Sequence, residues 1–147
     1  MKSILALFVA LAALITVTAP QAQAQSAPPQ VGHMRAAGVG ELHFKAAGRL
    51  EFHLHNKGVL VIRDAANHQV KLVGQGKVQT TAQGDLVIQS FKGKVIVKGK
   101  GMSGVFSKGR IGLIADGKGQ AKLKGKGLFK ANGVPGKWSK PAAQVSW

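Results

Sequence analysis

Glycine recurs at every eighth residue along much of this chain, and this spacing restricts what the chain can fold into. The longest series with this step is Gly93, Gly101, Gly109, Gly117, Gly125 and Gly133, and shorter series are Gly32, Gly40 and Gly48, and Gly76 and Gly84. Between the glycines, apolar and polar residues alternate. The second and fourth residues after a glycine are mostly apolar, as in Leu50/Phe52 and Ile111/Leu113. A period of two inside a period of eight predicts short β-strands joined by short turns.

Several connections resemble three-residue hairpin loops that end in a residue suited to the left-handed conformation. These loops are 56–58, 65–67, 82–84 and 107–109. A loop of three residues and a strand of five together make eight residues. Because successive side chains of a strand alternate between faces and eight is even, the apolar side chains of every strand stay on the same face. We therefore expect an all-β domain over residues 32–140, folded as a repeat-built antiparallel meander of about ten short strands, either barrel-like or a rolled sheet. The alternative is a β-solenoid in which each eight-residue step forms one side of a coil.

The opposite face of the expected sheet is also apolar in the middle of the chain. Its apolar residues are Val59, Val61, Val73, Val87, Phe91, Ile96, Phe106 and Ile114. A sheet that is apolar on both faces needs cover on both, which predicts curling, sandwich packing or a homo-oligomer. Trp138 and Trp147 follow the last repeat, and we expect them to cover an open end of the core.

The N-terminal segment of the chain predicts export. Lys2, the apolar run 4–17 and the small-x-small sequence Ala22-Gln23-Ala24 together indicate a Sec-type signal peptide at 1–24. A membrane anchor is the alternative reading of this run, but no charged stop-transfer pattern follows it. We expect 25–31 to be a flexible lead-in and 141–147 a C-terminal tail, with no transmembrane segment in the mature chain. The chain is then secreted or periplasmic.

Basic residues are concentrated in the C-terminal half. The segment 25–91 has seven basic and four acidic residues, whereas 92–140 has thirteen basic residues and one acid, Asp116. This asymmetry indicates an anionic partner for the second half. Lysines that keep the sheet edges from pairing with other chains are the alternative explanation.

A cationic face follows from the predicted hairpins. Its residues are Lys94, Lys98, Arg110, Lys118, Lys122, Lys126 and Lys130. A loop at 123–125 sets Lys122 opposite Lys126 and Lys118 opposite Lys130, and such like-charge pairs are unfavourable unless an anion relieves them. The predicted partners are anionic polysaccharide, lipopolysaccharide, phospholipid headgroups or extracellular DNA. The first alternative function is a structural envelope or extracellular protein that self-associates.

Binding of a divalent metal ion is the second alternative function. A loop at 46–48 sets Glu41 opposite His53 and His43 opposite Glu51, and these groups are ligands for Zn²⁺ or a similar divalent ion. Ordinary cross-strand charge pairs explain the same pattern. We expect no other cofactor, and this metal to bind weakly.

The residues for catalysis are few. The chain has no cysteine, which excludes disulfide scaffolds and thiol enzymes, and its five carboxylates are scattered along the repeats. No nucleophile, base and orienting group fall at motif spacing. We therefore expect a binding protein without enzymatic activity.

The mature protein is expected to begin at Gln25, directly after the cleavage sequence. Intact-mass analysis of exported protein measures this start. A start far from Gln25, or a chain retained whole in the membrane, contradicts the predicted signal peptide.

Overall fold

The computed structural model describes residues 31–147, and the predicted signal peptide and all but the last residue of the lead-in lie outside these residues. The described chain is all-β, with one six-stranded sheet and a single short 3-10 turn, η1 (Ala65–Asn67). The strands are β1 (Gly32–His55), β2 (Val59–Arg63), β3 (Gln69–Thr80), β4 (Leu86–Ala131), β5 (Val134–Lys137) and β6 (Ala143–Ser146). Among these residues, none forms a helix long and apolar enough to cross a membrane.

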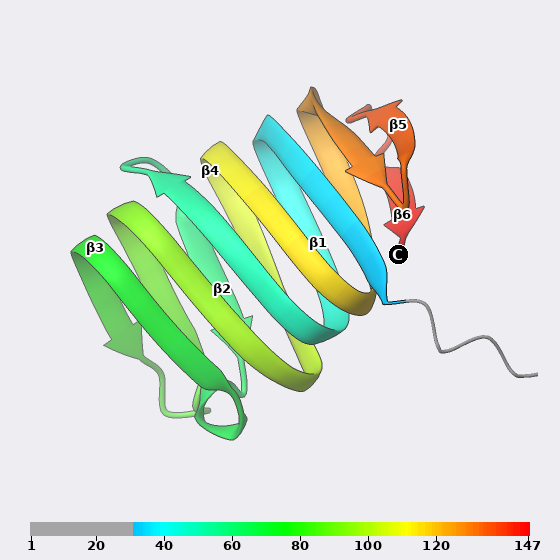
Figure 1. The fold of residues 1–147 in the computed structure, drawn as a ribbon. Coiled ribbons are helices and arrows are strands. Elements are labelled where there is room, and N and C mark those ends of the chain that lie inside the picture. Colours follow the sequence, from blue (N-terminus) through cyan, green and yellow to red (C-terminus); the bar gives the residue numbers. More distant parts are fainter. Residues whose placement is uncertain (1–30) are drawn as a thin grey trace, which may run out of the picture.

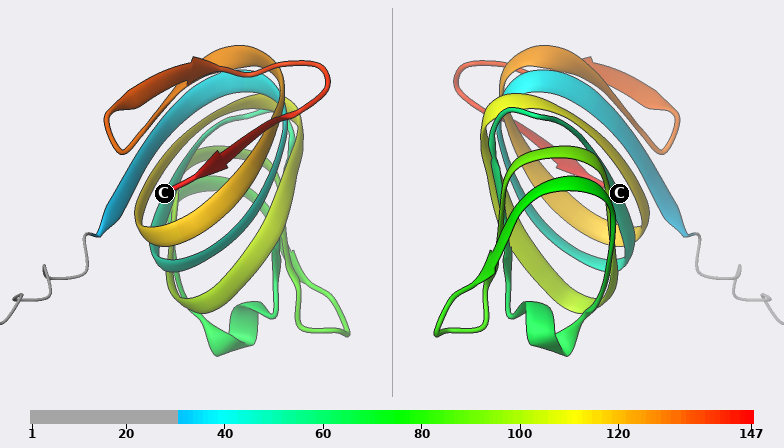
Figure 2. Two further views of the ribbon diagram at one scale, coloured as in Figure 1. Left: turned by 90° about the vertical axis from the view of Figure 1, so that its right-hand side faces the viewer. Right: turned by 90° about the vertical axis from the view of Figure 1, so that its left-hand side faces the viewer.

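Two very long strands take the place of the many short ones that the sequence predicted. β1 has 24 residues and β4 has 46, and both wind around a common axis as a coiled ribbon (Figure 1). The two strands are antiparallel and interleaved. Gly40 of β1 pairs with Gly109 on one side and with Gly125 on the other, so β4 makes one turn of the coil between these two glycines. Viewed along the axis, the coil is a flattened ring (Figure 2).

The remaining strands extend this coil without closing the sheet. β2 lies between two segments of β4, with Val61 opposite Val87 on one side and Val105 on the other. β3 pairs with β4 along one edge only. β5 and β6 pair with the last turn of β4 at the opposite end, so the segment predicted as a tail contains a strand.

Three predicted hairpin loops, at 46–48, 107–109 and 123–125, are continuous strand instead. At two of them the chain bends through a glycine that faces another glycine. Gly48 and Gly117 have φ values of 125° and 126°, and Gly40 and Gly125 have values of 148° and 134°. A side chain on Gly48 would collide with the backbone of Asp116 and Gly117. These glycines therefore let two strand segments bend together in close contact, without breaking the hydrogen-bonded ladder.

The predicted loops at 56–58 and 82–84 are confirmed as connections, between β1 and β2 and between β3 and β4. Asn56 is left-handed in the first loop, with φ 62°. The loop at 65–67 forms η1, and there Asp64 adopts the left-handed conformation that we expected of Asn67.

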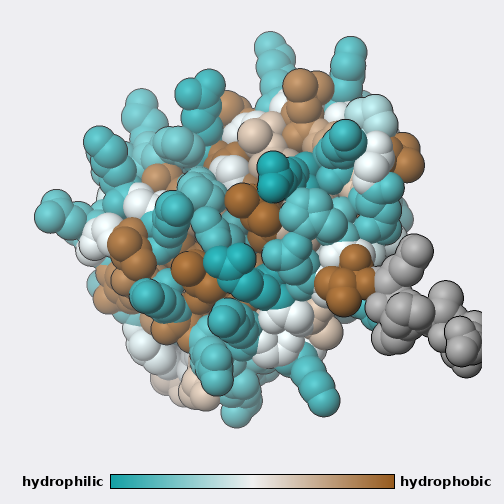
Figure 3. All heavy atoms as spheres, viewed as in Figure 1, coloured by the Kyte–Doolittle hydropathy of each residue, from teal (hydrophilic) through white to brown (hydrophobic). Residues whose placement is uncertain are grey.

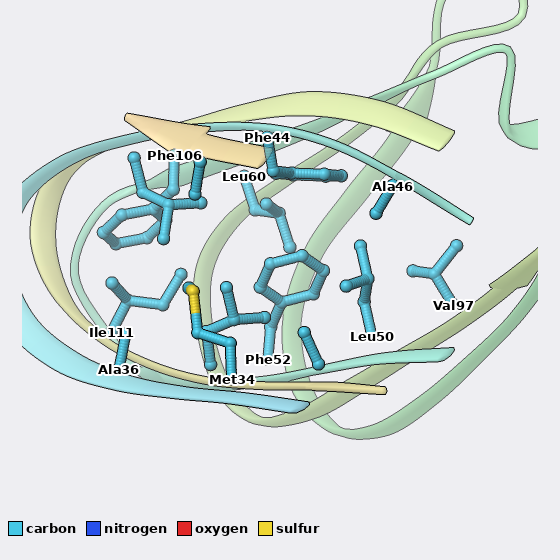
Figure 4. Close-up of a cluster of buried hydrophobic side chains, with 14 of the residues drawn as sticks. Met34, Ala36, Phe44, Ala46, Leu50, Phe52, Leu60, Val97, Phe106 and Ile111 are labelled. Atoms are coloured by element: carbon cyan, nitrogen blue, oxygen red, sulfur yellow. The ribbon is translucent and has the colours of Figure 1, made fainter. Parts of the chain in front are cut away.

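The core fills the inside of the coil, and the alternating pattern predicts it well. Side chains at the predicted inward positions, including Phe44, Leu50, Phe52 and Val97, point into the ring (Figure 4). Val97 is fully buried and its neighbour Lys98 is exposed, as the alternation requires. Trp138 and Trp147 are buried at the end near β5 and β6, where their indole rings lie against Gly38 and Gly127, and against Gly119. Their predicted role as a cover for the core is confirmed.

Bulges in β4 explain why the predicted second apolar face is incomplete. Four residues of β4, from Phe106 to Gly109, lie opposite the three from Leu42 to Gly40, and Lys108 in this bulge has φ 59°. Another extra residue, between Gly99 and Met102, which lie opposite Gly48 and Ala46, turns Phe106 into the core, and the bulge at Lys108 returns Ile111 to the inward position. A similar bulge at Ser90 turns Phe91 inward.

Replacing Gly117 with alanine is expected to destabilise the fold by about 2–4 kcal/mol, through a strained positive φ and a clash with the carbonyl oxygen of Ala47. Gly112→Ala is the matched control in the same strand. Its new methyl group has its nearest contact with the Cβ of His53, at 3.4 Å, which is an ordinary van der Waals distance, so stability changes by at most about 0.5 kcal/mol. Urea denaturation compares the two. Equal losses would show that the bends do not depend on glycine.

Candidate anion-binding faces

The bends divide the outer surface of the coil into two flat faces, which we name after a central residue of each. The Lys45 face contains the outward side chains of 41–47 in β1, of β2, and of 102–107 and 118–124 in β4. The Glu51 face contains those of 33–39 and 49–55 in β1, and of 94–98, 110–116 and 126–131 in β4. The Glu51 face is in front in Figure 1, and most of its surface is hydrophilic, with isolated apolar residues between (Figure 3).

All seven predicted anion-binding residues are exposed. Lys118 and Lys122 lie on the Lys45 face. Lys94, Lys98, Arg110, Lys126 and Lys130 lie on the Glu51 face. Within residues 31–147 only Lys94 of these seven has an ion pair, at 3.6 Å from Glu51.

The predicted opposition of Lys122 with Lys126, and of Lys118 with Lys130, is wrong. No hairpin forms at 123–125, because β4 continues through the bend at Gly125. Lys122 pairs with His43 and Lys126 pairs with Val39 instead. The four lysines therefore do not form one strip, since two of them lie on each face.

Two other pairs of like charges face each other across strands. Arg35 of β1 is opposite Lys130, and Arg49 is opposite Lys98, both on the Glu51 face. Such pairs are unfavourable in a sheet. These pairs are not the ones that the sequence predicted.

The predicted opposition of metal ligands is also wrong, because 46–48 lies inside β1. Glu41 pairs with Lys124 and His43 with Lys122, whereas Glu51 and His53 lie one half-turn further along the coil. Between residues 31 and 147, no group of three or more histidine, aspartate or glutamate side chains comes together in a way that would hold a metal ion. The structure thus brings together only the Glu51–His53 part of the expected site.

Glu51 is the centre of a cationic cluster. Its side chain is 11% exposed, and its oxygens lie 2.6 Å from Arg49 Nη2, 2.8 Å from His53 Nε2 and 3.6 Å from Lys94 Nζ. Burial raises the pKa of the carboxyl group. The hydrogen bond with His53 and the charges of Lys94 and Arg49 lower it by more, so the pKa lies below its ordinary value of 4.5. Glu51 is therefore a carboxylate at neutral pH.

Asp116 extends this cluster toward the next bend. Its carboxylate contacts the ring nitrogen Nδ1 of His33 and lies 3.9 Å from Arg49 Nη1. Arg35 in turn donates a hydrogen bond to His33, over 3.1 Å. Both acids of the Glu51 face are thus engaged with basic groups of the same face.

The Lys45 face holds basic residues that the sequence did not single out. A shallow groove of about 380 Å³ crosses it, and its lining includes His43, Lys45, Arg63, Ser103 and Lys122. A larger hollow at the adjoining bend shares Lys45, Ser103 and Gln120 with this groove, and Lys118 lines it too. The alternation shows that Lys45 and Arg63 point outward. No signal in the sequence shows that β2 lies two strand positions from β1 across β4.

Comparisons of the chain with protein-family models, with curated proteins and with solved structures found no match. The geometry of the two faces therefore carries the functional argument alone.

Replacing Glu51 with glutamine is expected to lower stability at pH 7 by about 1–2 kcal/mol, because charge-assisted hydrogen bonds are lost. A carboxyl group with a lowered pKa stabilises the fold above its ordinary pKa, and this contribution is lost as the pH falls through the lowered value. The difference between wild type and variant should therefore shrink below about pH 4.5. Glu41→Gln, whose exposed carboxylate pairs only with Lys124 at 3.5 Å, should have little effect. Thermal melts of the wild type and both variants across this pH range measure these differences in stability. A difference for Glu51→Gln that does not change with pH would contradict the lowered pKa of Glu51.

Proposed function

We propose that this chain is an exported, non-catalytic protein that binds an anionic polymer or surface through the basic residues of 92–140. The observation that carries the proposal is the lack of carboxylates near most of the exposed cations. Six of the seven predicted anion-binding residues have no ion pair within the described part of the chain. An anionic partner would neutralise them.

The positions of the five acids support this proposal. Glu51 and Asp116 lie within the cluster around Arg49, and Glu41 pairs with Lys124. Asp64 and Asp85 lie at the turns after β2 and before β4, where a carboxylate oxygen of Asp85 accepts a hydrogen bond from the backbone of Asp64. In the described part of the chain, none of the five has an ion pair with Lys118, Lys122, Lys126 or Lys130.

The backbone beneath these cations is held by strand pairing on both sides. The segment 120–123 of β4 pairs with β1 along one edge and with β6 along the other. The lysine side chains therefore project from a fixed surface, and less ordering of the backbone accompanies binding. Anionic polysaccharide, lipopolysaccharide, phospholipid headgroups and extracellular DNA all present the required charge.

A second candidate function is self-association, and β3 is the feature that favours it. Each paired residue of β3 has a partner only in β4, so within residues 31–147 the other edge of this strand is free. Leu72, Val73 and Val78 of the same strand are 38–49% exposed. A free strand edge with exposed apolar residues is a site for pairing with another chain. Assembly that depends on protein concentration and persists at high salt would favour this function over polyanion binding.

Binding to dextran sulfate is expected to weaken steeply between low and physiological salt, because counterion release drives such binding. Replacing Lys118, Lys122, Lys126 and Lys130 with glutamine should weaken binding and reduce the slope of log Kd against log salt. The reduction should be roughly 0.7 for each lysine that contacts the polymer. Isothermal titration calorimetry at several salt concentrations measures both quantities.

The control for this variant replaces Arg35, Lys57, Lys71 and Lys77 with glutamine, which removes the same charge from exposed positions outside 92–140. Equal losses in the two variants would mean that net charge alone is responsible. Absence of binding by the wild type at low salt would exclude the proposed function.

A further inference from the structure

The side chains of the Lys45 face form rows that run across the strands. One row passes from β2 over two segments of β4 and one of β1 to β6, and its members in order are Arg63, Ser103, Lys45, Gln120 and Ser146. The two cations of this row alternate with neutral side chains that form hydrogen bonds. The row contains no carboxylate.

The spacing of the cations follows from the spacing of the strands. Neighbouring strands lie about 4.8 Å apart, so the backbones at Arg63 and Lys45 are separated by roughly 10 Å, with Ser103 between them. Beyond Lys45 the row continues to Gln120. Lys118 and Lys122 lie on either side of Gln120 along β4 and point outward in the same way. Arg63 and Lys45 are thus about two strand spacings apart along the row, and Lys118 and Lys122 flank its next position.

The second row borders the groove on one side. It contains Val61, Val105, His43, Lys122 and Gln144. The groove between the rows is lined by both of them, and its volume is about 380 Å³. Its side walls thus carry Lys45, Arg63 and Lys122, while Ser103 offers a hydroxyl group between the cations.

The nearest acid on this face is already neutralised. Glu41 lies four residues before Lys45 on β1 and pairs with Lys124 at 3.5 Å. Lys45, Arg63, Lys118 and Lys122 have no ion pair among residues 31–147. The Glu51 face differs, because two carboxylates occupy the centre of its cationic cluster.

We propose that this groove binds an anionic polysaccharide in which an acidic sugar alternates with a neutral one. The polymer lies along the row and across the strands. Its acidic groups meet Arg63 and Lys45, and the neutral sugar between them hydrogen-bonds with Ser103. The inference rests on the proposed polyanion binding, and it adds two cations from outside 92–140, Lys45 and Arg63, and a spacing for the ligand.

The surface of this groove fits a glycan better than a nucleic acid. No phenylalanine or tryptophan is among the exposed large apolar residues of the described chain, so the surface lacks the aromatic platforms on which unpaired bases stack. Sugars need hydroxyl, amide and charged groups, and the row supplies them in alternation. One sugar ring is also about as long as the strand spacing of about 4.8 Å.

The test uses a hyaluronan octasaccharide, in which glucuronate alternates with N-acetylglucosamine. An oligogalacturonate with the same number of carboxylates, all on neighbouring sugars, is the comparison ligand. Electrostatic attraction alone favours oligogalacturonate, whose charges lie closer together. Tighter binding of hyaluronan would therefore support a match between the spacing of its carboxylates and that of the two cations. Lys45→Gln/Arg63→Gln should weaken hyaluronan binding at least about tenfold, because two charge-assisted contacts are lost.

The matched control is Lys57→Gln/Lys71→Gln, which removes two exposed charges outside this face and outside 92–140. It should change hyaluronan affinity by less than about threefold. Circular dichroism melts establish that both variants fold.

Three results would overturn the inference. The first is an equal loss of hyaluronan affinity in the two double variants, and the second is binding of oligogalacturonate as tight as that of hyaluronan. The third is binding of an oligothymidylate that is tighter than that of hyaluronan and is lost in the Lys45→Gln/Arg63→Gln variant. Dextran sulfate serves as the reference in each series. If it still binds, the proposed function stands without the inferred ligand; if it does not bind at all, the proposed function fails as well.

Discussion

The close contact between facing glycines is the constraint on which the rest of this structure depends. At Gly48 and Gly117, and at Gly40 and Gly125, two neighbouring strand segments bend together where neither has a side chain. Any larger residue would meet the backbone of the opposite segment. Because the bends recur every eight residues, the sheet folds into a flattened coil, and inward side chains from all turns meet in one core.

The eight-residue period and the alternation predicted which residues are buried, because both properties depend on local backbone geometry. The inward positions of Phe44, Leu50 and Val97 followed directly from them. Whether a glycine ends a strand in a hairpin or bends it within a longer strand depends on what lies opposite. For Gly48 this is Gly117, which is 69 residues away. Local sequence therefore predicted turns where the structure has bends.

For the candidate site, the sequence predicted which basic side chains are exposed but not which of them lie together. Exposure of the lysines follows from alternation, and the structure agrees with it. The grouping of the lysines does not follow from alternation, because most residues of β1 lie between two segments of β4 that are far apart in the chain. Lys45 and Arg63 come from the half of the sequence with the smaller excess of charge, yet coiling places them beside Lys118 and Lys122. Bulges at Ser90 and Lys108 add a further shift that no pattern in the sequence marks.

The interleaving of β1 with β4 has a consequence for how such a chain lengthens during evolution. A duplication of eight residues in β4 alone would add a half-turn with no segment of β1 beside it, and its backbone donors and acceptors would lose their partners. A duplication in β1 alone would fail for the same reason. Growth of the coil therefore requires two matched insertions at distant places in the gene, so repeat number should change far more slowly here than in a repeat protein built from a single series of units.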